Sequence, residues 1–221
     1  MVGHTRFFCC GFCYIERYNG ITQSEYRTVH HLFDFRSFPT LQSDRLLLRE
    51  IVSSDSEGVF ALRGDYEVTR YNIGAAYTDM SQALDLISGM DRAYRQCAEI
   101  RWGITLIPDD LVIGMCGYNY WDRTDHRASI GFDLRRSFWR RGIMREALIA
   151  ILQFGFDQML LNRIEADASI DNIASIHLLQ SLGFQQEGIQ RQQYYEDDQY
   201  HDLVLFGLLK EEWSGGEKQN R

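Results

Sequence analysis

The residues best suited to chemistry lie in a basic loop that ends at a glycine. Four arginines lie between Arg135 and Arg141, a fifth follows at Arg145, and Gly142 stands at the turn. Glycine lets the backbone approach a ligand closely, and the unpaired N–H groups at a helix start point toward an anion. The loop therefore predicts a site for a ligand that carries phosphate, such as a pyrophosphate. The alternative is a solvated basic loop whose glycine serves only the turn.

A second candidate group lies further along the chain, at the start of an expected helix. Asn172 and Ser175 are three residues apart in its first turn, so both side chains lie on one face at the electropositive end. They could bind a ligand there. The alternative is that both are N-terminal capping groups with no further role.

The elements that must position these residues follow from hydrophobic spacing and from capping signals. The sequence predicts strands at 45–50, 102–107, 112–120, 128–134, 163–169 and 203–209. It predicts helices at 53–62, 81–96, 143–159 and 173–182, and Gly183 closes the last of them. The segment 194–200 is expected to be a loop.

This order indicates an α/β protein with one domain. We expect a mixed, mostly antiparallel twisted sheet with helices on both faces and one right-handed parallel crossover around helix 143–159. The domain is predicted at 39–213, between an N-terminal appendage at 1–38 and a flexible tail at 214–221. The sequence does not decide whether the appendage is a flexible arm, a helix docked on the domain or residues from an upstream start.

Composition narrows the class of protein further. The net charge of -8 disfavours nucleic acid as a partner, and no apolar stretch reaches the roughly 20 residues that span a bilayer. Glu16 and Arg17 stand where a signal peptide would need a small-residue cleavage site. The five cysteines form no zinc pattern, so we expect reduced thiols in a cytoplasmic protein without a metal.

Taken together, the two segments resemble the GNAT superfamily of N-acetyltransferases, and within it the Rim-type enzymes that acetylate ribosomal-protein N-termini. The stretch Trp139-Arg-Arg-Gly-Ile-Met144 stands where the family has Gln/Arg-x-x-Gly-x-Gly/Ala, and Glu146-Ala147 follows as in this subgroup. Asp171-Asn-x-x-Ser-x-x-Leu-Leu-x-x-x-Gly-Phe184 matches the later family motif. Two residues depart from the pattern: Trp139, and Met144, which could narrow the approach to a pyrophosphate.

The resemblance implies acetyl-CoA as the cosubstrate and a site for it. The residues expected to bind it are Phe132, Asp133, Leu134, Trp139, Arg140, Arg141, Gly142, Ile143, Met144, Arg145, Asn172 and Ser175. Strand end 132–134 would pair with the pantetheine arm, and loop 140–145 would hold the pyrophosphate. Ser175, or a water that it holds, would protonate the leaving thiolate, with Asn172 beside it.

The resemblance implies direct acetyl transfer to an amine, either a protein N-terminal α-amine or a small-molecule amine. Glu165 and Glu196 are the candidate general bases, and a surface position or an ion pair without a catalytic role is the alternative for both. The acidic run 196–198 suggests a cationic acceptor, and a solvated turn is the alternative for this run. The sequence leaves open whether the protein forms a homodimer. The alternative function is a catalytically silent protein that binds CoA as a sensor or scaffold.

Overall fold

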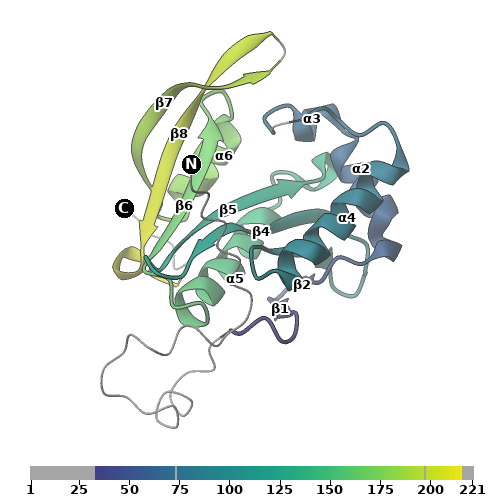
Figure 1. Ribbon diagram of the computed structural model, residues 1–221, viewed down its shortest axis with the longest axis horizontal. Coiled ribbons are helices and arrows are strands. Elements are labelled where there is room, and N and C mark those ends of the chain that lie inside the picture. Colours follow the sequence, from purple (N-terminus) through teal and green to yellow (C-terminus); the bar gives the residue numbers. More distant parts are fainter. Residues whose placement is uncertain (1–32, 73, 197, 216–221) are drawn as a thin grey trace, which may run out of the picture.

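The computed structural model describes residues 33–215 except 73 and 197, and its strands form a single twisted sheet (Figure 1). The strand order is β1-β2-β3-β4-β5-β6-β8-β7. The strands are β1 (Leu41–Gln42), β2 (Leu46–Arg49), β3 (Ile100–Leu106), β4 (Gly114–Asp122), β5 (Arg127–Leu134), β6 (Arg163–Ser169), β7 (Gln185–Glu196) and β8 (Gln199–Leu209). The helices of more than one turn are α2 (Ser56–Arg63), α4 (Met80–Arg95), α5 (Ile143–Asp157) and α6 (Ile173–Ser181), and α3 (Tyr66–Thr69) is a single turn.

The sheet is mostly antiparallel, and its one parallel contact is short. Strands β3, β4 and β5 form the predicted meander, and the chain then crosses through α5 to β6. Only three residue pairs join β5 to β6, ending at Ser129 opposite Glu165. Beyond that pair the two strands separate toward their carboxyl ends, while β6 continues to pair with β8 along its full length. The sheet is therefore split between β5 and β6.

Helix α5 covers one face of the sheet and is held close to it by a glycine. Nine of its residues are buried, among them Ile151 and Phe156. Gly155 lies against Tyr118 of β4 so closely that a Cβ there would stand 2.0 Å from the phenolic oxygen. The Tyr118 hydroxyl donates to the Ile151 carbonyl at 2.6 Å, which satisfies a buried polar group. This contact fixes the depth of α5, and with it the position of the loop that precedes it.

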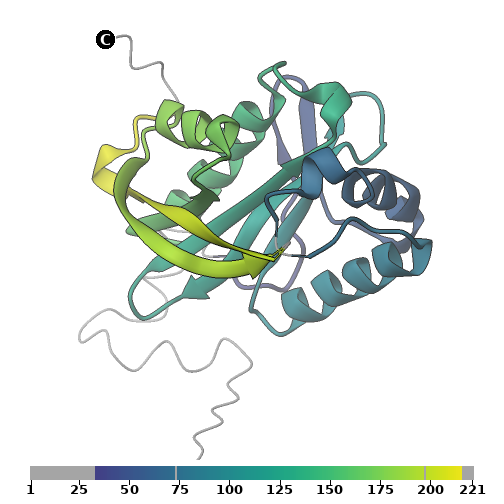
Figure 2. The same cartoon turned by 90° about the horizontal axis from the view of Figure 1, so that it is seen from above.

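Helices α2 and α4 cover the other face of the sheet, over strands β2 to β5 (Figure 2). A second core cluster forms there from Val59 and Leu62 of α2, Ile87 of α4 and Met115 of β4, among others. Helices on both faces of a mixed sheet confirm the predicted fold class. Strands β6, β8 and β7 extend beyond these helices, so this side of the three strands is not covered by α2 or α4 (Figure 2).

The described end of the predicted appendage packs on the domain. The backbone N–H of Phe33 donates to the carbonyl of Gln158, and Phe35 and Phe38 contact aromatic rings of the core. Residues 1–32, which include three of the cysteines, and tail residues 216–221 lie outside the described part of the chain. Within the described part, no helix is long and apolar enough to cross a membrane.

The sequence-based expectation was wrong at the last hairpin. Residues 194–200 were expected to be a loop, but Tyr194 and Tyr195 belong to β7, and Tyr200 belongs to β8. Strand β7 was not predicted at all, because its segment Gln185–Glu196 is almost wholly polar and lacks an apolar alternation. It pairs with β8 at the edge of the sheet, where backbone hydrogen bonds suffice to hold a polar strand.

Candidate functional site

The split between β5 and β6 brings two helix starts to the same end of the sheet. Because the two strands run parallel, the loops after them emerge at one edge, where α5 and α6 begin. Unpaired N–H groups at a helix start carry partial positive charge. The arrangement therefore places two electropositive helix ends beside an opening in the sheet.

The loop before α5 has the backbone shape of an anion-binding nest. Arg140 has a φ of 59° and Gly142 a φ of 72°, so two left-handed residues flank Arg141. A backbone turn of this kind can direct successive N–H groups to one side. In the described part of the chain, no protein group accepts a hydrogen bond from the N–H groups of Arg141, Gly142 or Ile143. Three adjacent donors are thus available to one anionic group.

The side chains of this loop divide between the core and the solvent. Ile143 and Met144 are buried beneath the loop, so only their backbone faces it. Met144 therefore does not narrow the approach to the nest, as its sequence position suggested. Arg140 and Arg141 are exposed above it. The indole of Trp139 donates to the carbonyl of Leu134 at 2.6 Å, which fastens the loop to the end of β5.

An ion pair fastens the same loop to Arg45, the residue just before β2. Glu146, in the first turn of α5, lies 2.6 Å from the Arg45 guanidinium and also accepts a hydrogen bond from the Ser43 hydroxyl. A second nitrogen of Arg45 donates to the Arg141 carbonyl at 3.2 Å. Burial alone would raise the pKa of Glu146, but the bonds from Ser43 and Arg45 outweigh it and lower this pKa. We call Ser43, Arg45 and Glu146 the loop latch.

Asn172 and Ser175 both lie at the start of α6, as expected. The Asn172 side-chain oxygen accepts the backbone N–H of Ser175 at 3.1 Å, so Asn172 is the N-cap of the helix. This bond uses only one of the polar atoms of the Asn172 amide and leaves the Ser175 hydroxyl untouched. The capping role and a ligand role are therefore compatible at this helix start.

Asp133, near the end of β5, turns its side chain toward the α2 face of the sheet. Its carboxylate is buried and accepts hydrogen bonds from Arg63 at 3.1 Å and from Asn72 at 2.6 Å. The sequence indicated only a backbone role for Asp133, and neither partner could be found from spacing. The contact ties the segment after α3 to the split edge. A cavity of about 540 Å³ lies alongside, lined by Ala61, Asp65, Arg135, Arg136 and Ser137.

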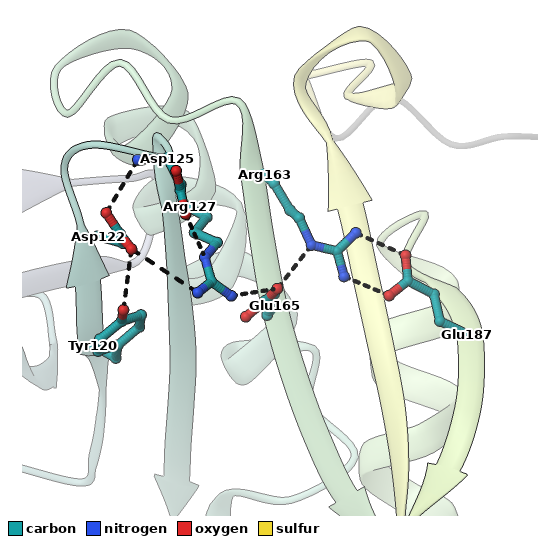
Figure 3. Close-up of polar contacts among 7 residues, drawn as sticks. All are labelled: Tyr120, Asp122, Asp125, Arg127, Arg163, Glu165 and Glu187. Atoms are coloured by element: carbon teal, nitrogen blue, oxygen red, sulfur yellow. Dashed lines mark hydrogen bonds and ion pairs between the residues drawn. The ribbon is translucent and has the colours of Figure 1, made fainter.

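Glu165, one of the two predicted bases, lies in a network of ion pairs on the side of the sheet away from α5 (Figure 3). One of its oxygens is 2.8 Å from Arg163 and 3.6 Å from Arg127. Arg163 also holds Glu187 of β7, and this contact lowers the pKa of Glu187. The arrangement matches the ion-pair duty that the sequence left open for Glu165.

The second predicted base and the acidic run lie at the tip of the β7–β8 hairpin. Glu196 ends β7 and its side chain, like all of Asp197, lies outside the described part of the chain. Asp198 accepts a hydrogen bond from the Tyr195 hydroxyl. The rings of Tyr194 and His201 stack beside it with centroids 4.9 Å apart. In Figure 1 the tip extends beyond the sheet at the end where α3 lies.

Other contributors to this region were not foreseen. Ser43, Arg45, Arg63 and Asn72 come from segments far from the motifs in the chain, and their partners depend on the tertiary fold. One signal in the sequence could have indicated the latch. Glu146 is an acidic residue at a helix start where the other charged residues are arginines, so an ion pair could be expected there. Among the described residues, no group of histidine, cysteine, aspartate or glutamate side chains could hold a metal ion.

Fold and site together define an α/β protein that presents an anion-binding loop at the edge of a split sheet. The family model of the acetyltransferase (GNAT) domain matches residues 45–185. The chain belongs to this family and is an acyltransferase of the N-acetyltransferase class. The membership in the GNAT superfamily that the sequence predicted is thereby confirmed.

Three comparisons illustrate the relationship. The chain is 38% identical over 176 residues to the uncharacterized N-acetyltransferase p20 of Bacillus licheniformis, covering 80% of this chain and 99% of the relative. It is 30% identical over 111 residues to the ribosomal protein uS5-alanine N-acetyltransferase of Escherichia coli, covering 49% and 57% of the two chains. Its fold is similar to that of RimL, a ribosomal L7/L12 α-N-protein acetyltransferase solved with coenzyme A, with a TM-score of 0.71, 20% identity and coverage of 77% and 98%.

Proposed function

We propose that this enzyme transfers the acetyl group of acetyl-CoA directly to an amine, and that the acceptor is the N-terminal α-amine of a protein. A ribosomal protein is the first choice, and a small-molecule amine is the second. The observation that carries the proposal is the split between β5 and β6, with the N–H nest of Arg141, Gly142 and Ile143 at its mouth. A nest, a gap in the sheet and exposed arginines suit a ligand that ends in a pyrophosphate and continues as a thin arm.

The cofactor residues divide by the part of acetyl-CoA that they would hold. The N–H groups of 141–143, with the exposed guanidiniums of Arg140 and Arg141, would bind the pyrophosphate. Backbone groups of Phe132 and Asp133 would pair with the pantetheine arm, since the Leu134 carbonyl already accepts from Trp139. Asn172 and Ser175 would face the arm from the other side of the split.

When bound, acetyl-CoA supplies an activated thioester, so the chain needs to orient the acyl group and manage protons. Among the described residues, the Ser175 hydroxyl makes no hydrogen bond, which leaves it able to donate a proton to the departing sulfur. Asn172 keeps the helix start rigid beneath it through its cap. A covalent enzyme intermediate is not required, because positioning two bound reactants can supply much of the rate.

The nature of the acceptor is supported by the relatives and by charge. The relatives named above include enzymes whose names state ribosomal proteins as substrates. A ribosomal acceptor would place the reaction in the cytoplasm, which suits the unpaired Cys97 and Cys116. The net charge of -8 would attract a cationic acceptor over long range.

The proposal is tested with a panel of N-terminal peptides of ribosomal proteins, their N-terminally blocked versions, and small polyamines. We expect CoA release with at least one free peptide, acetylation of its α-amine, and no reaction with the blocked version. Binding of acetyl-CoA without turnover on any amine would instead support the silent sensor or scaffold.

A further inference from the structure

Asp167 stands at the mouth of the split. On β6 it follows Glu165, the last residue paired with β5, by two positions. Side chains alternate along a strand, so Asp167 lies on the same face as Glu165, while Ile164, Ala166 and Ala168 are buried against the other face. The corresponding position on β5, two residues after Ser129, is Gly131, and the Asn119 amide of β4 lies over it, 2.6 Å from where a Cβ would stand.

The other carboxylates on this face are already engaged. Asp133 accepts from Arg63 and Asn72, and both Glu165 and Glu187 pair with Arg163. In the described part of the chain, Asp167 has no hydrogen-bond or ion-pair partner. Solvent reaches its side chain, yet the surrounding protein removes enough water to raise the pKa of this carboxyl above its usual value.

The neighbours of Asp167 do not pair with its carboxylate, so the carboxylate can contact a ligand. Its partner across the antiparallel ladder is Leu205 of β8, an apolar residue. The titratable side chains on this face include Glu165 on the same strand, Asp133 on β5, Glu187 on β7 and His201 on β8. The guanidiniums of Arg127 and Arg163 are directed to Glu165 and Glu187. A cation entering from this face therefore meets Asp167 as the unpaired carboxylate at the split.

We propose that Asp167 is the catalytic residue that accepts the proton of the acceptor ammonium at the mouth of the split. This role rests on the proposed acetyl transfer to an amine. One proton passes from the ammonium nitrogen to the Asp167 carboxylate, and the freed lone pair forms a bond to the thioester carbonyl carbon. The carbon–sulfur bond then breaks and the sulfur takes the hydroxyl proton of Ser175. The second proton of the nitrogen replaces it on Ser175 as the amide forms. Asp167 finally returns its proton to water.

The test is the pH profile of kcat/KM for Asp167→Asn, which keeps the shape of the side chain but cannot accept the proton. At pH 6 we expect a loss of about 100-fold, the size of a typical general-base contribution, with an unchanged KM for acetyl-CoA. The loss should shrink by about tenfold per pH unit toward the acceptor pKa of about 7.7, because the free amine then forms in solution. Glu187→Gln, which removes an ion-paired carboxylate on the same face, should keep the wild-type profile.

The outcomes separate this role from the proposed function. Wild-type turnover tests the acetyl transfer, and the ratio of variant to wild type tests Asp167. An active wild type with an Asp167→Asn variant of equal rate at pH 6, or with a loss that does not change with pH, overturns the role of Asp167 alone. An inactive wild type overturns both. A second readout uses carboxyl carbon NMR: the Asp167 signal, assigned by its loss in the variant, should titrate lower when a cationic acceptor peptide binds, and an unmoved midpoint would also overturn the role.

Discussion

Arg45 and Glu146, which are 101 residues apart in the chain, form an ion pair that joins the start of β2 to the first turn of α5; Arg45 directly precedes Leu46, the first residue of β2. The same guanidinium donates to the carbonyl of Arg141, next to the N–H nest. A single side chain thus holds both ends of the turn that the proposed pyrophosphate site depends on. The relationship links the residue before β2 to the proposed pyrophosphate site.

Replacing Arg45 with Gln should weaken acetyl-CoA binding more than it lowers stability. Arg45 is half exposed, so its ion pair contributes at most about 1 kcal/mol to the free energy of unfolding. Misplacing the nest should raise the dissociation constant of acetyl-CoA by about tenfold, because one hydrogen bond to a charged group contributes about 1.5 kcal/mol. Calorimetric titration and thermal melts measure the two effects. Arg36→Gln, which removes an exposed ion pair with Asp34, is the control and should change neither.

The latch also predicts a pH effect with a definite sign. The pKa of Glu146 is lowered in the folded protein from its ordinary 4.5, so its contribution to stability is present above that value. It is lost as the pH falls through the folded pKa. The wild-type melting temperature should therefore drop more than that of Glu146→Gln between pH 6 and pH 3, and parallel curves would contradict the latch.

Replacing Gly142 with Val should abolish stabilisation by acetyl-CoA. At a φ of 72° a β-branched residue is strained by about 1–3 kcal/mol, so the nest would reshape. A ligand at 100 times its dissociation constant stabilises by about 2.7 kcal/mol, which is easily seen in a melt. Gly183→Val imposes the same kind of strain at a φ of 93°, at the far end of α6. It should lower the melting temperature yet keep the ligand-induced increase. An equal increase in the Gly142 variant would exclude the nest as the pyrophosphate site.

Variants of Ser175 and Asn172 distinguish a catalytic role from a helix-capping role. The cap bond uses the backbone N–H of Ser175, so Ser175→Ala retains it and should keep its stability. If Ser175 supplies the proton to sulfur, kcat should fall by about 100-fold with little change in acetyl-CoA binding. Asn172→Ala removes the cap and should cost about 1 kcal/mol of unfolding free energy. A Ser175→Ala enzyme with wild-type kcat would assign Ser175 to structure alone.

Replacing Asp167 with Asn should lower activity but raise stability at pH 7. Because burial raises its pKa in the folded protein above the ordinary 3.8, the stability linked to this group is present below that value and lost as the pH rises through the raised pKa. Asp167→Asn should therefore melt at a higher temperature than the wild type at pH 7, and the gain should vanish near pH 3. A variant that is less stable at pH 7 would show that the carboxylate has a structural partner.

The sequence was sufficient for much of the fold because buried elements carry strong periodic patterns. Strand β6 and the start of α5 were predicted at their observed residues, since both are bounded by clear signals and face the core. Strand β7 was missed because its residues are mostly polar and show no apolar alternation. It is held in the sheet by backbone pairing with β8. The short α3 also carries too few residues to show a helical period.

The site could be predicted only as far as its motifs reach along the chain. Gly142, Asn172 and Ser175 were found because local backbone geometry dictates their residue types. The partners of Asp133 and Glu146 come from distant segments, and no local spacing encodes them. The possible obstruction by Met144 could be settled only by the burial of its side chain, which depends on how α5 packs on the sheet.

The most direct test of direct transfer follows thiol and amine in the same sample. Free CoA thiol and unmodified acceptor α-amine are measured together over a time course with limiting enzyme and a free N-terminal peptide. Direct transfer predicts one thiol released for each amine lost, no release when the peptide is omitted, and no acetyl group left on the enzyme. Thiol release that continues without the peptide, or an acetylated enzyme that forms before the product, would contradict it.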